Sequence, residues 1–439
     1  MAQPMASIYG SMVHKIITHL GSTMFTFTPP QNHRSVPATS PHPSPLPSWT
    51  TRYQPNLNAL QVPNQEFPIH QLLDHLSAAG RKRTVDLVRR HLKINCELAG
   101  LDAHRLFSTR QNVVSLSKVR NLSVHVERIY DRLLTCYSEQ AQQAPTITGG
   151  STQQQVPIAS IPTPSVLSQD LNPLLDDLCK AHLVGDDPRT IGFVTTQFHF
   201  TTRAIFKRLK LWDQVLLYPY LQFAEEQVCM PWQDLNQAAL RHLPHSPEVL
   251  LVDQMIGQCD QIAIAVYQQA RQQLSSMKSV RGDLNHPDVA ASMIRDTTMF
   301  QTYLWLCFLQ GDMSAVQDRL LPLCMMVFPS VGVSWEWVYQ MLVMLMSQIS
   351  EQLSAEQWDL VRPTAERLLE TFMLEDDLSH SPSYNLIEQR IEAAQNPAAL
   401  PEQTQLEEQA AYRFFQPIAL ADLIPSQPFA PHLWSAFKG

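Results

Sequence analysis

The sequence contains little charge and little glycine. Only 16% of its 439 residues are charged, and 13 residues are Gly whereas 32 are Pro. An average soluble domain has roughly 25% charged residues, and the composition excludes collagen-like, coiled-coil and strongly charged disordered classes. An apolar content of 44% supplies a large core. At roughly 100–200 residues per domain, the length predicts two or three folded units.

The sequence also lacks the cysteine pattern of a secreted protein. Its seven cysteines are an odd number, are widely spaced and include no C-x-x-C pair. Several lie within apolar runs, as Cys307 does, which is typical of reduced buried thiols. Lys15 is the first basic residue and Arg34 the second, so a signal-peptide pattern is missing from the start. We therefore expect a reducing, cytoplasmic environment.

No apolar run is long enough to cross a membrane without interruption. Leu320–Met346 carries a single acidic residue, but Pro322, Pro329 and Gly332 divide it. Each part is shorter than the roughly 20 residues that a spanning helix requires. We expect two buried helices joined by a turn and no transmembrane span.

Signatures of enzymes and of metal sites are missing as well. The glycines form neither a phosphate-binding loop nor a nucleophile elbow. His242 and His245 form an H-x-x-H pair, but Pro244 interrupts it and no Cys or carboxylate cluster is near, which favours a loop over zinc. His199 is a candidate haem ligand, although we expect it to be satisfied by a backbone acceptor. We therefore predict no enzymatic activity and no metal.

The chain divides into segments of different composition and charge. Residues 1–66 are predicted to be a disordered Pro-rich arm, 67–141 a basic helical bundle, 142–166 a linker, 167–376 a helical domain with an N-terminal extension, and 377–439 a tail with aromatic segments. Residues 67–135 hold twelve Lys or Arg and six Asp or Glu (+6), whereas residues 136–439 hold seventeen and thirty-three (−16). This asymmetry favours different partners for different segments, or one segment docking on another.

The helical domain has clear apolar periodicity in its later part. Helices are predicted at Pro247–Leu274, Pro287–Gly311, Ser314–Val327, Ser334–Ile349 and Ser354–Phe372. Ser354 is expected to cap the last helix together with Gln357. Thr190–Thr202 fits a strand or a helix, and a helix is favoured because the apolar pattern continues beyond it. Three glycines fall at the joints, where glycines end helices: Gly282, Gly311 and Gly332.

The most specific pattern begins at Met293. It reads Met293-Ile294-Arg295-Asp296, then Tyr303, Gly311-Asp312, Ser314 and Asp318-Arg319. This pattern resembles the phycobiliprotein family, the globin-like light-harvesting subunits of cyanobacterial phycobilisomes. The central helix of that family carries Cys-x-Arg-Asp, then Tyr, Gly-Asp and Asp-Arg, and the spacing from Met293 to Arg319 matches without a gap.

The resemblance implies an all-α, globin-like phycobiliprotein-type fold for residues 167–376. In the family the Arg pairs with a bilin propionate and the Asp holds the pyrrole nitrogens, so Arg295, Asp296 and Tyr303 correspond to a vestigial bilin pocket. Met293 stands where the family has the cysteine that bonds the bilin, and a thioether cannot form that thiolate-derived linkage. We expect no covalent cofactor. A bilin held noncovalently by Arg295 and Asp296 is the alternative to a purely structural role, which we favour.

The basic bundle carries a set of cations on successive turns of one predicted helix. They are Arg81, Lys82, Arg83, Arg89 and Arg90. Such a set can bind an acidic protein surface or a phosphate backbone. Aromatic residues for base stacking are nearly absent from this segment, so nucleic acid is the least favoured partner. A solvated face is the competing interpretation.

These observations predict a non-pigmented phycobiliprotein-like protein that serves the phycobilisome as a structural, assembly or regulatory component. Its expected partners are phycobilisome subunits or other acidic proteins, and a homodimer fits the pairing of globin subunits in the family. The expected location is the cytoplasm or the cytoplasmic face of the thylakoid membrane. The alternative is a cofactor-free globin-like signalling adaptor that binds a protein partner through its basic bundle, and fold alone does not separate the two.

Overall fold

The computed structural model describes residues 25–28, 45–53, 69–108, 113–139, 146–149, 154–157, 164–183, 187–274 and 277–373. Over these residues the protein has thirteen α-helices, one short π-helical segment and five short strands. The predicted all-α class is therefore confirmed. The predicted tail, 377–439, and most of the predicted arm, 1–66, lie outside the described residues.

The strands are minor additions to the helical fold. β1 (Phe25–Thr28), β2 (Thr146–Gly149) and β3 (Gln154–Pro157) form one antiparallel sheet, and β4 (Lys278–Ser279) pairs with β5 (Gly282–Asp283). Two of these strands lie within the segment predicted to be a linker, 142–166. Their β-branched residues, such as Thr146, Ile147 and Val156, favour extended backbone.

Six helices form what we call the N-terminal bundle. They are α3 (Ile69–Leu76), α4 (Ala78–Ser108), α5 (Leu116–Glu139), α6 (Pro164–Leu183), α7 (Thr190–Phe206) and α8 (Leu211–Cys229). The 31-residue α4 packs against both α5 and α7. Gln197 on α7 donates hydrogen bonds to the Cys96 carbonyl of α4 and to Ser123 of α5. The bundle therefore extends beyond the predicted boundary at residue 141 and includes helices that the sequence pattern assigned to the following domain.

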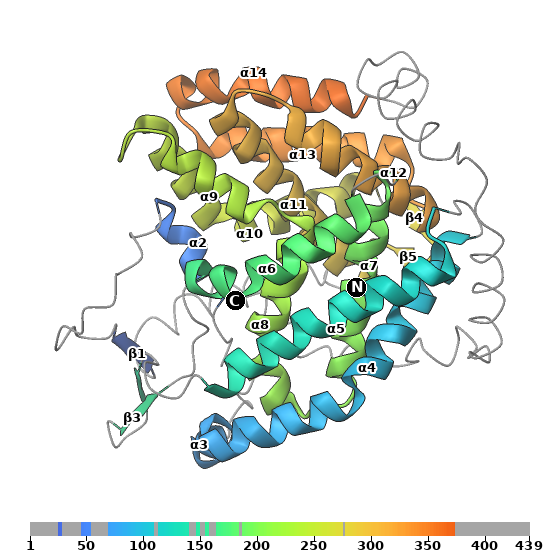
Figure 1. Cartoon of the computed structure of the whole chain (residues 1–439). Helices are drawn as coiled ribbons and strands as arrows, with labels where there is room; N and C mark the ends of the chain where they lie inside the picture. The colour runs from blue at the N-terminus through green and yellow to red at the C-terminus, as the bar shows by residue number, and fades with distance from the viewer. Residues whose placement is uncertain are drawn as a thin grey trace, which may run out of the picture.

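The remaining helices, α9 to α14, gather at the other end of the molecule. They are α9 (Trp232–Leu240), α10 (Pro247–Gln273), α11 (Pro287–Gln310), the π-helical Val316–Leu320, α12 (Leu321–Ser330), α13 (Trp335–Gln352) and α14 (Ala355–Thr371). Figure 1 shows most of them, from yellow to orange, above the blue and green helices of the N-terminal bundle. α10 packs against α11 and α13, and α14 packs on the same two helices.

Local sequence signals set the ends of these helices. Gly311 follows α11 with a φ of 77°, a left-handed conformation that glycine adopts without strain. The capping box of Ser354 and Gln357 is present at the start of α14, as predicted. Gly282 is different, because it belongs to the β4–β5 hairpin, so the prediction that it ends a helix is wrong.

The N-terminal bundle and the C-terminal helices share one core and are in contact at several places. α7 packs on α12 where Gly192 faces Met326, so closely that a Cβ at Gly192 would lie 2.7 Å from the Met326 Cβ. Away from this contact, the short α2 (Pro47–Thr51), which precedes the bundle, packs on α10. There Leu46, Trp49 and Tyr53 are only 1%, 2% and 1% exposed.

Among the described helices, α10 has the length and apolar composition that a membrane crossing would need. Half of its most apolar window (50%) is buried inside the protein, which is also the behaviour of a core helix. Composition alone therefore does not distinguish the two. The apolar stretch Leu320–Met346 forms two helices, α12 and α13, joined by a turn at Gly332, as predicted.

Candidate functional site

Met293 lines a cavity between the N-terminal bundle and the C-terminal helices. The cavity has a volume of about 120 Å³, and its walls come from α7, the β4–β5 hairpin, α11, α12 and α13, among other elements. Its polar side includes His199, Arg281, Asp288, Arg295 and Asp296. Its apolar side includes Met299, Val327, Phe328, Trp337 and Met341. The cavity is thus lined by both charged and apolar side chains.

The structure brings together three of the four residues assigned to the vestigial pocket. Met293, Arg295 and Asp296 all line the cavity, whereas Tyr303 does not. Tyr303 lies two helical turns beyond Asp296, about 10 Å along the axis of α11. Its buried ring instead lies under the Arg319 guanidinium, 5.8 Å from the ring centroid.

Arg295 and Asp296 are bound to each other. The Nη2 and Nε atoms of Arg295 donate to Oδ1 of Asp296 at 2.8 and 3.1 Å. Burial lowers the pKa of Arg295, but the Asp296 carboxylate outweighs it and raises that pKa above its ordinary value. The Arg295 guanidinium therefore stays charged and is paired with the Asp296 carboxylate.

The other charged residues of the motif are also engaged within the chain. Asp312 accepts hydrogen bonds from the backbone N–H and the hydroxyl of Ser314, at 2.9 and 2.6 Å. Arg319 donates to Asp234 on α9 at 2.7 Å. These contacts fit the structural role that the sequence favoured.

His199 faces a carboxylate and not a backbone acceptor, so that prediction is wrong. Its Nδ1 lies 3.5 Å from Oε2 of Glu225 on the next helix, 26 residues further along the chain. Burial lowers the pKa of His199, the positive charges of Arg295 and Arg203 lower it further, and Glu225 opposes this. A contact between neighbouring helices leaves no local signal in the sequence, which is why it was missed.

The space within the cavity is small beside an open-chain tetrapyrrole. An engineered cavity of about 150 Å³ holds one benzene molecule, and the volume here is about 120 Å³, whereas a bilin has four pyrrole rings. The Arg and Asp that would hold the pigment are paired with each other. A bilin would have to compete with this ion pair for Arg295 and Asp296.

The predicted basic surface on α4 is smaller than expected. Arg81 is only 4% exposed, because it shares a face of α4 with Thr84, Val85 and Val88, which pack into the core. Arg81 is therefore not part of the exposed basic surface of α4. The other four cations of the set are exposed: Lys82, Arg83, Arg89 and Arg90.

Two of the exposed cations have acidic neighbours on the bundle itself. Arg83 pairs with Asp74 at 2.6 Å, and Arg89 pairs with Asp131 at 2.7 Å. Lys82 and Arg90 make no ion pair with any described residue. Binding of a partner at this surface remains a prediction.

The residues described contain no group of three or more His, Cys, Asp or Glu that could hold a metal ion. The Nε2 atom of His242 lies 2.9 Å from the carbonyl oxygen of Leu309. All seven cysteines are free thiols, and Cys179 is exposed whereas the other six are buried.

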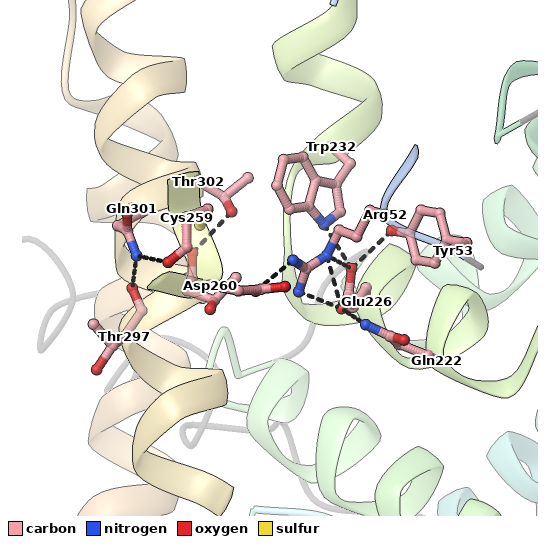
Figure 2. Close-up of polar contacts among 11 residues, drawn as sticks. Arg52, Tyr53, Gln222, Glu226, Trp232, Cys259, Asp260, Thr297, Gln301 and Thr302 are labelled. Atoms are coloured by element: carbon pink, nitrogen blue, oxygen red, sulfur yellow. Dashed lines mark hydrogen bonds and ion pairs between the residues drawn. The ribbon is translucent and has the colours of Figure 1, made fainter. Parts of the chain in front are cut away.

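A buried polar network around Glu226 was not predicted from the sequence. Figure 2 shows Arg52 between Glu226 of α8 and Asp260 of α10. Arg52 donates to both oxygens of Glu226 at 2.9 Å and to Asp260 at 2.6 Å. Tyr53 and Trp232 donate to the same Oε2 of Glu226 at 2.7 and 3.0 Å. Arg52 lies in the segment predicted to be disordered, 174 residues before Glu226, so no local pattern announces the contact.

The network anchors α2 both to α8 of the N-terminal bundle and to α9 and α10 of the C-terminal helices. Burial lowers the pKa of Arg52, but the nearby Asp260 and Glu226 outweigh it and raise that pKa, so the guanidinium stays charged. Trp49 stacks on Trp232 with ring centroids 6.3 Å apart. The backbone N–H of Ser48 donates to Asp253 on α10 at 2.8 Å. These contacts and the burial of Trp49 make α2 part of the folded body.

A comparison with known protein families identifies the C-terminal helices. Residues 235–372 match the family model described as phycobilisome protein. These residues are therefore similar to phycobilisome proteins, and we call them the phycobilisome domain. The match begins inside α9 and ends one residue after α14, so it coincides with the helices at one end of the molecule. The resemblance drawn from the Met293–Arg319 motif is confirmed.

No curated protein and no solved structure matches the chain. The phycobilisome domain supplies α11, α12 and α13 to the walls of the cavity, together with the β4–β5 hairpin. The N-terminal bundle and Arg52 lie outside the matched residues. The cavity is therefore a joint feature of the phycobilisome domain and a second group of helices.

Proposed function

We propose that this protein is a non-pigmented component associated with the phycobilisome, with a structural, assembly or regulatory role. One observation carries the proposal. Residues 235–372 match the phycobilisome protein family, and the resemblance of the motif places Met293 where the family has the bilin-bonding cysteine. A domain without that thiolate cannot bond a bilin. Its role would then depend on its surfaces, because function lies in sites and not in the fold.

The pairing within the cavity supports a pigment-free domain. Arg295 is held by Asp296, so a bilin propionate would have to compete with a carboxylate already in place. A noncovalent bilin is the alternative, and it is tested together with the covalent one.

Absorption spectroscopy tests the absence of pigment. The full chain is co-expressed with a bilin-making pathway, purified and then denatured in acidic urea. We expect no visible absorption on the native or the unfolded chain, because Met293 cannot form the linkage. Colour that persists after unfolding would contradict the proposal, and colour lost on unfolding would identify a noncovalent bilin. A Met293→Cys variant is the matched comparison, since it restores the thiol and nothing else.

We propose that the exposed cations of α4 bind acidic surfaces of phycobilisome subunits. Lys82 and Arg90 have no acidic partner among the described residues, so they are available to an external carboxylate. Contacts of exposed charges weaken as salt screens them. The association should therefore decrease as ionic strength rises.

Co-sedimentation with purified phycobilisomes tests the association. The wild-type chain should sediment with the complexes, and the double variant Lys82→Glu and Arg90→Glu should bind about tenfold less tightly, since like charges repel. The control is Arg120→Glu with Arg128→Glu, which reverses two exposed cations on α5. Failure of the wild type to co-sediment, together with capture of a kinase or a transcription component from a cyanobacterial lysate, would favour the signalling adaptor.

A further inference from the structure

Residues 46–53, which we call the docking segment, lie in a groove formed by α8, α9 and α10. Three side chains of the segment are almost fully buried there: Leu46, Trp49 and Tyr53. Trp49 stacks on Trp232 of α9. The helix within the segment, α2, has only five residues, and so short a helix is not stable by itself in water. The groove therefore holds the segment in its conformation.

The face of α10 that lines the groove fits the docking segment closely. Asp253, Gly257 and Asp260 follow one another at intervals of four and three residues, which places them on one face of the helix. Asp253 accepts from the backbone N–H of Ser48 at 2.8 Å, and Asp260 accepts from Arg52 at 2.6 Å. Between these two carboxylates, Gly257 has no side chain and lets Ser48 approach. The stripe is acidic at both ends and open in the middle.

Glu226 at the bottom of the groove takes its counter-charge from the docking segment (Figure 2). Its other hydrogen-bond donors among the described residues are neutral: Gln222, Trp232 and Tyr53. A buried carboxylate is costly unless it is paired with a cation. The groove therefore suits a segment that carries both an aromatic anchor and an arginine three residues later, as Trp49 and Arg52 do.

The length of the connection allows the segment to reach more than one groove. Residues 54–68 separate Tyr53 from α3, and a chain of this length can span up to about 50 Å. The segment would make the same contacts in the groove of another copy as in its own. The choice between the two grooves then depends on the reach of the connection and on the protein concentration.

We propose that the groove formed by α8, α9 and α10 also binds the docking segment of a second copy of this chain, so that two copies are linked by exchanged segments. Exchange of an identical element needs no new complementary surface. The segment lies outside the matched residues 235–372, and the inference does not rest on the proposed function. Because binding in a second copy is bimolecular, exchange should increase with protein concentration.

Disulfide trapping tests the exchange. A Cβ at Gly257 would lie 3.7 Å from the Ser48 Cβ, a separation that a disulfide requires. Ser48→Cys and Gly257→Cys are made in separate full-length chains, each with Cys179→Ser because Cys179 is the exposed thiol. Mixed in a glutathione redox buffer, the two chains should form a covalent dimer linked between positions 48 and 257, which peptide mass mapping identifies. The dimer yield should rise with protein concentration.

Two controls accompany the mixture. A chain with both Ser48→Cys and Gly257→Cys should form the same link, which confirms that the segment occupies the groove. A mixture of Ser48→Cys with Ser347→Cys, at an exposed position on α13, measures the background of chance collisions between thiols.

Arg52→Gln distinguishes competition for the groove from chance contact. On the chain that carries Gly257→Cys, it weakens the segment already in the groove and should raise the dimer yield by up to about tenfold. On the chain that carries Ser48→Cys, it weakens the incoming segment and should lower the yield by a similar factor, the usual effect of a hydrogen bond to a charged group. Trp49→Phe keeps the ion pair and should give the same opposite effects with smaller factors.

Three results would overturn the inference. A dimer yield that does not exceed the Ser347→Cys background at any concentration would show that each segment stays in its own copy, and this comparison needs no change to Arg52 or Trp49. A doubly substituted chain without the link between positions 48 and 257 would show that the segment does not occupy the groove. Equal effects of Arg52→Gln on the two chains would show that the dimer does not arise by competition.

Discussion

Arg52 and Glu226 form a buried bidentate ion pair with two N–O distances of 2.9 Å, although 174 residues separate them. Their side chains are 10% and 6% exposed. The pair connects a segment that precedes the N-terminal bundle to the last helix of that bundle. Trp232 of α9 joins the same carboxylate through its ring N–H.

Glu226→Gln should strongly destabilise the fold. Removing one partner of a buried ion pair costs up to about 3–5 kcal/mol, and Arg52 would keep only the exposed Asp260 as a counter-charge. The measurement is the free energy of unfolding from urea denaturation. Asp260→Asn is the control, since Asp260 contacts the same guanidinium at 2.6 Å but is 62% exposed, and an exposed pair contributes about 1 kcal/mol or less. Equal losses in the two variants would refute this account.

Gly192→Ala should destabilise the contact between α7 and α12. The new Cβ would lie 2.7 Å from the Met326 Cβ and 3.1 Å from the Leu323 carbonyl oxygen, and overpacking of this kind costs about 1–3 kcal/mol. Thermal denaturation measures the loss. Gly257→Ala is the matched control, because its nearest neighbour is the rotatable Ser48 hydroxyl at 3.3 Å, and Ala favours a helix interior by up to about 1 kcal/mol. A loss in the control as large as in Gly192→Ala would count against the steric argument.

His199 should make the stability of the protein depend on pH below neutrality. Its folded-state pKa is lowered by burial, whereas an unfolded histidine titrates near about 6.5. Between these two values the unfolded chain binds more protons, so stability falls as pH decreases from about 6.5. His199→Gln should remove this part of the slope of unfolding free energy against pH. The prediction fails if the variant and the wild type have the same slope between pH 7 and 5.

Ser354→Ala should cost about 1 kcal/mol of stability, the usual value of an N-cap side chain. The Ser354 hydroxyl accepts from the Gln357 backbone N–H at 3.2 Å, and the Gln357 side-chain oxygen accepts from the Ser354 backbone N–H at 3.0 Å. Urea denaturation measures the change. Ser347→Ala on the exposed face of α13 should be neutral within about 0.5 kcal/mol. A neutral Ser354→Ala would show that α14 does not depend on its cap.

The sequence predicted the helices of the phycobilisome domain well because their ends are marked locally. Pro287 begins α11 and Gly311 ends it, and both signals act within one turn. The motif from Met293 predicted the family for the same reason, since its residues lie on consecutive turns of α11 and just beyond it.

Contacts between distant segments could not be predicted in this way. Arg52 contacts Glu226, and His199 contacts Glu225, across intervals that no periodicity encodes. Likewise, Gln197 joins α7 to α4, so the bundle includes helices that follow residue 141. Arg81 is buried because it lies on the face of α4 that packs into the core. The run of basic residues around it does not show which of them lie on that face.

The attachments at Gly192 and at Trp49 have a mechanical consequence. A single attachment would allow the two halves of the molecule to swing about it, but contacts at separate places, among them the link of α2 to both α10 and α8, oppose such a rotation. A force applied to one end of the molecule would be transmitted to the other with little bending. A partner bound to the N-terminal bundle would therefore keep a fixed distance and angle from a partner bound to the phycobilisome domain.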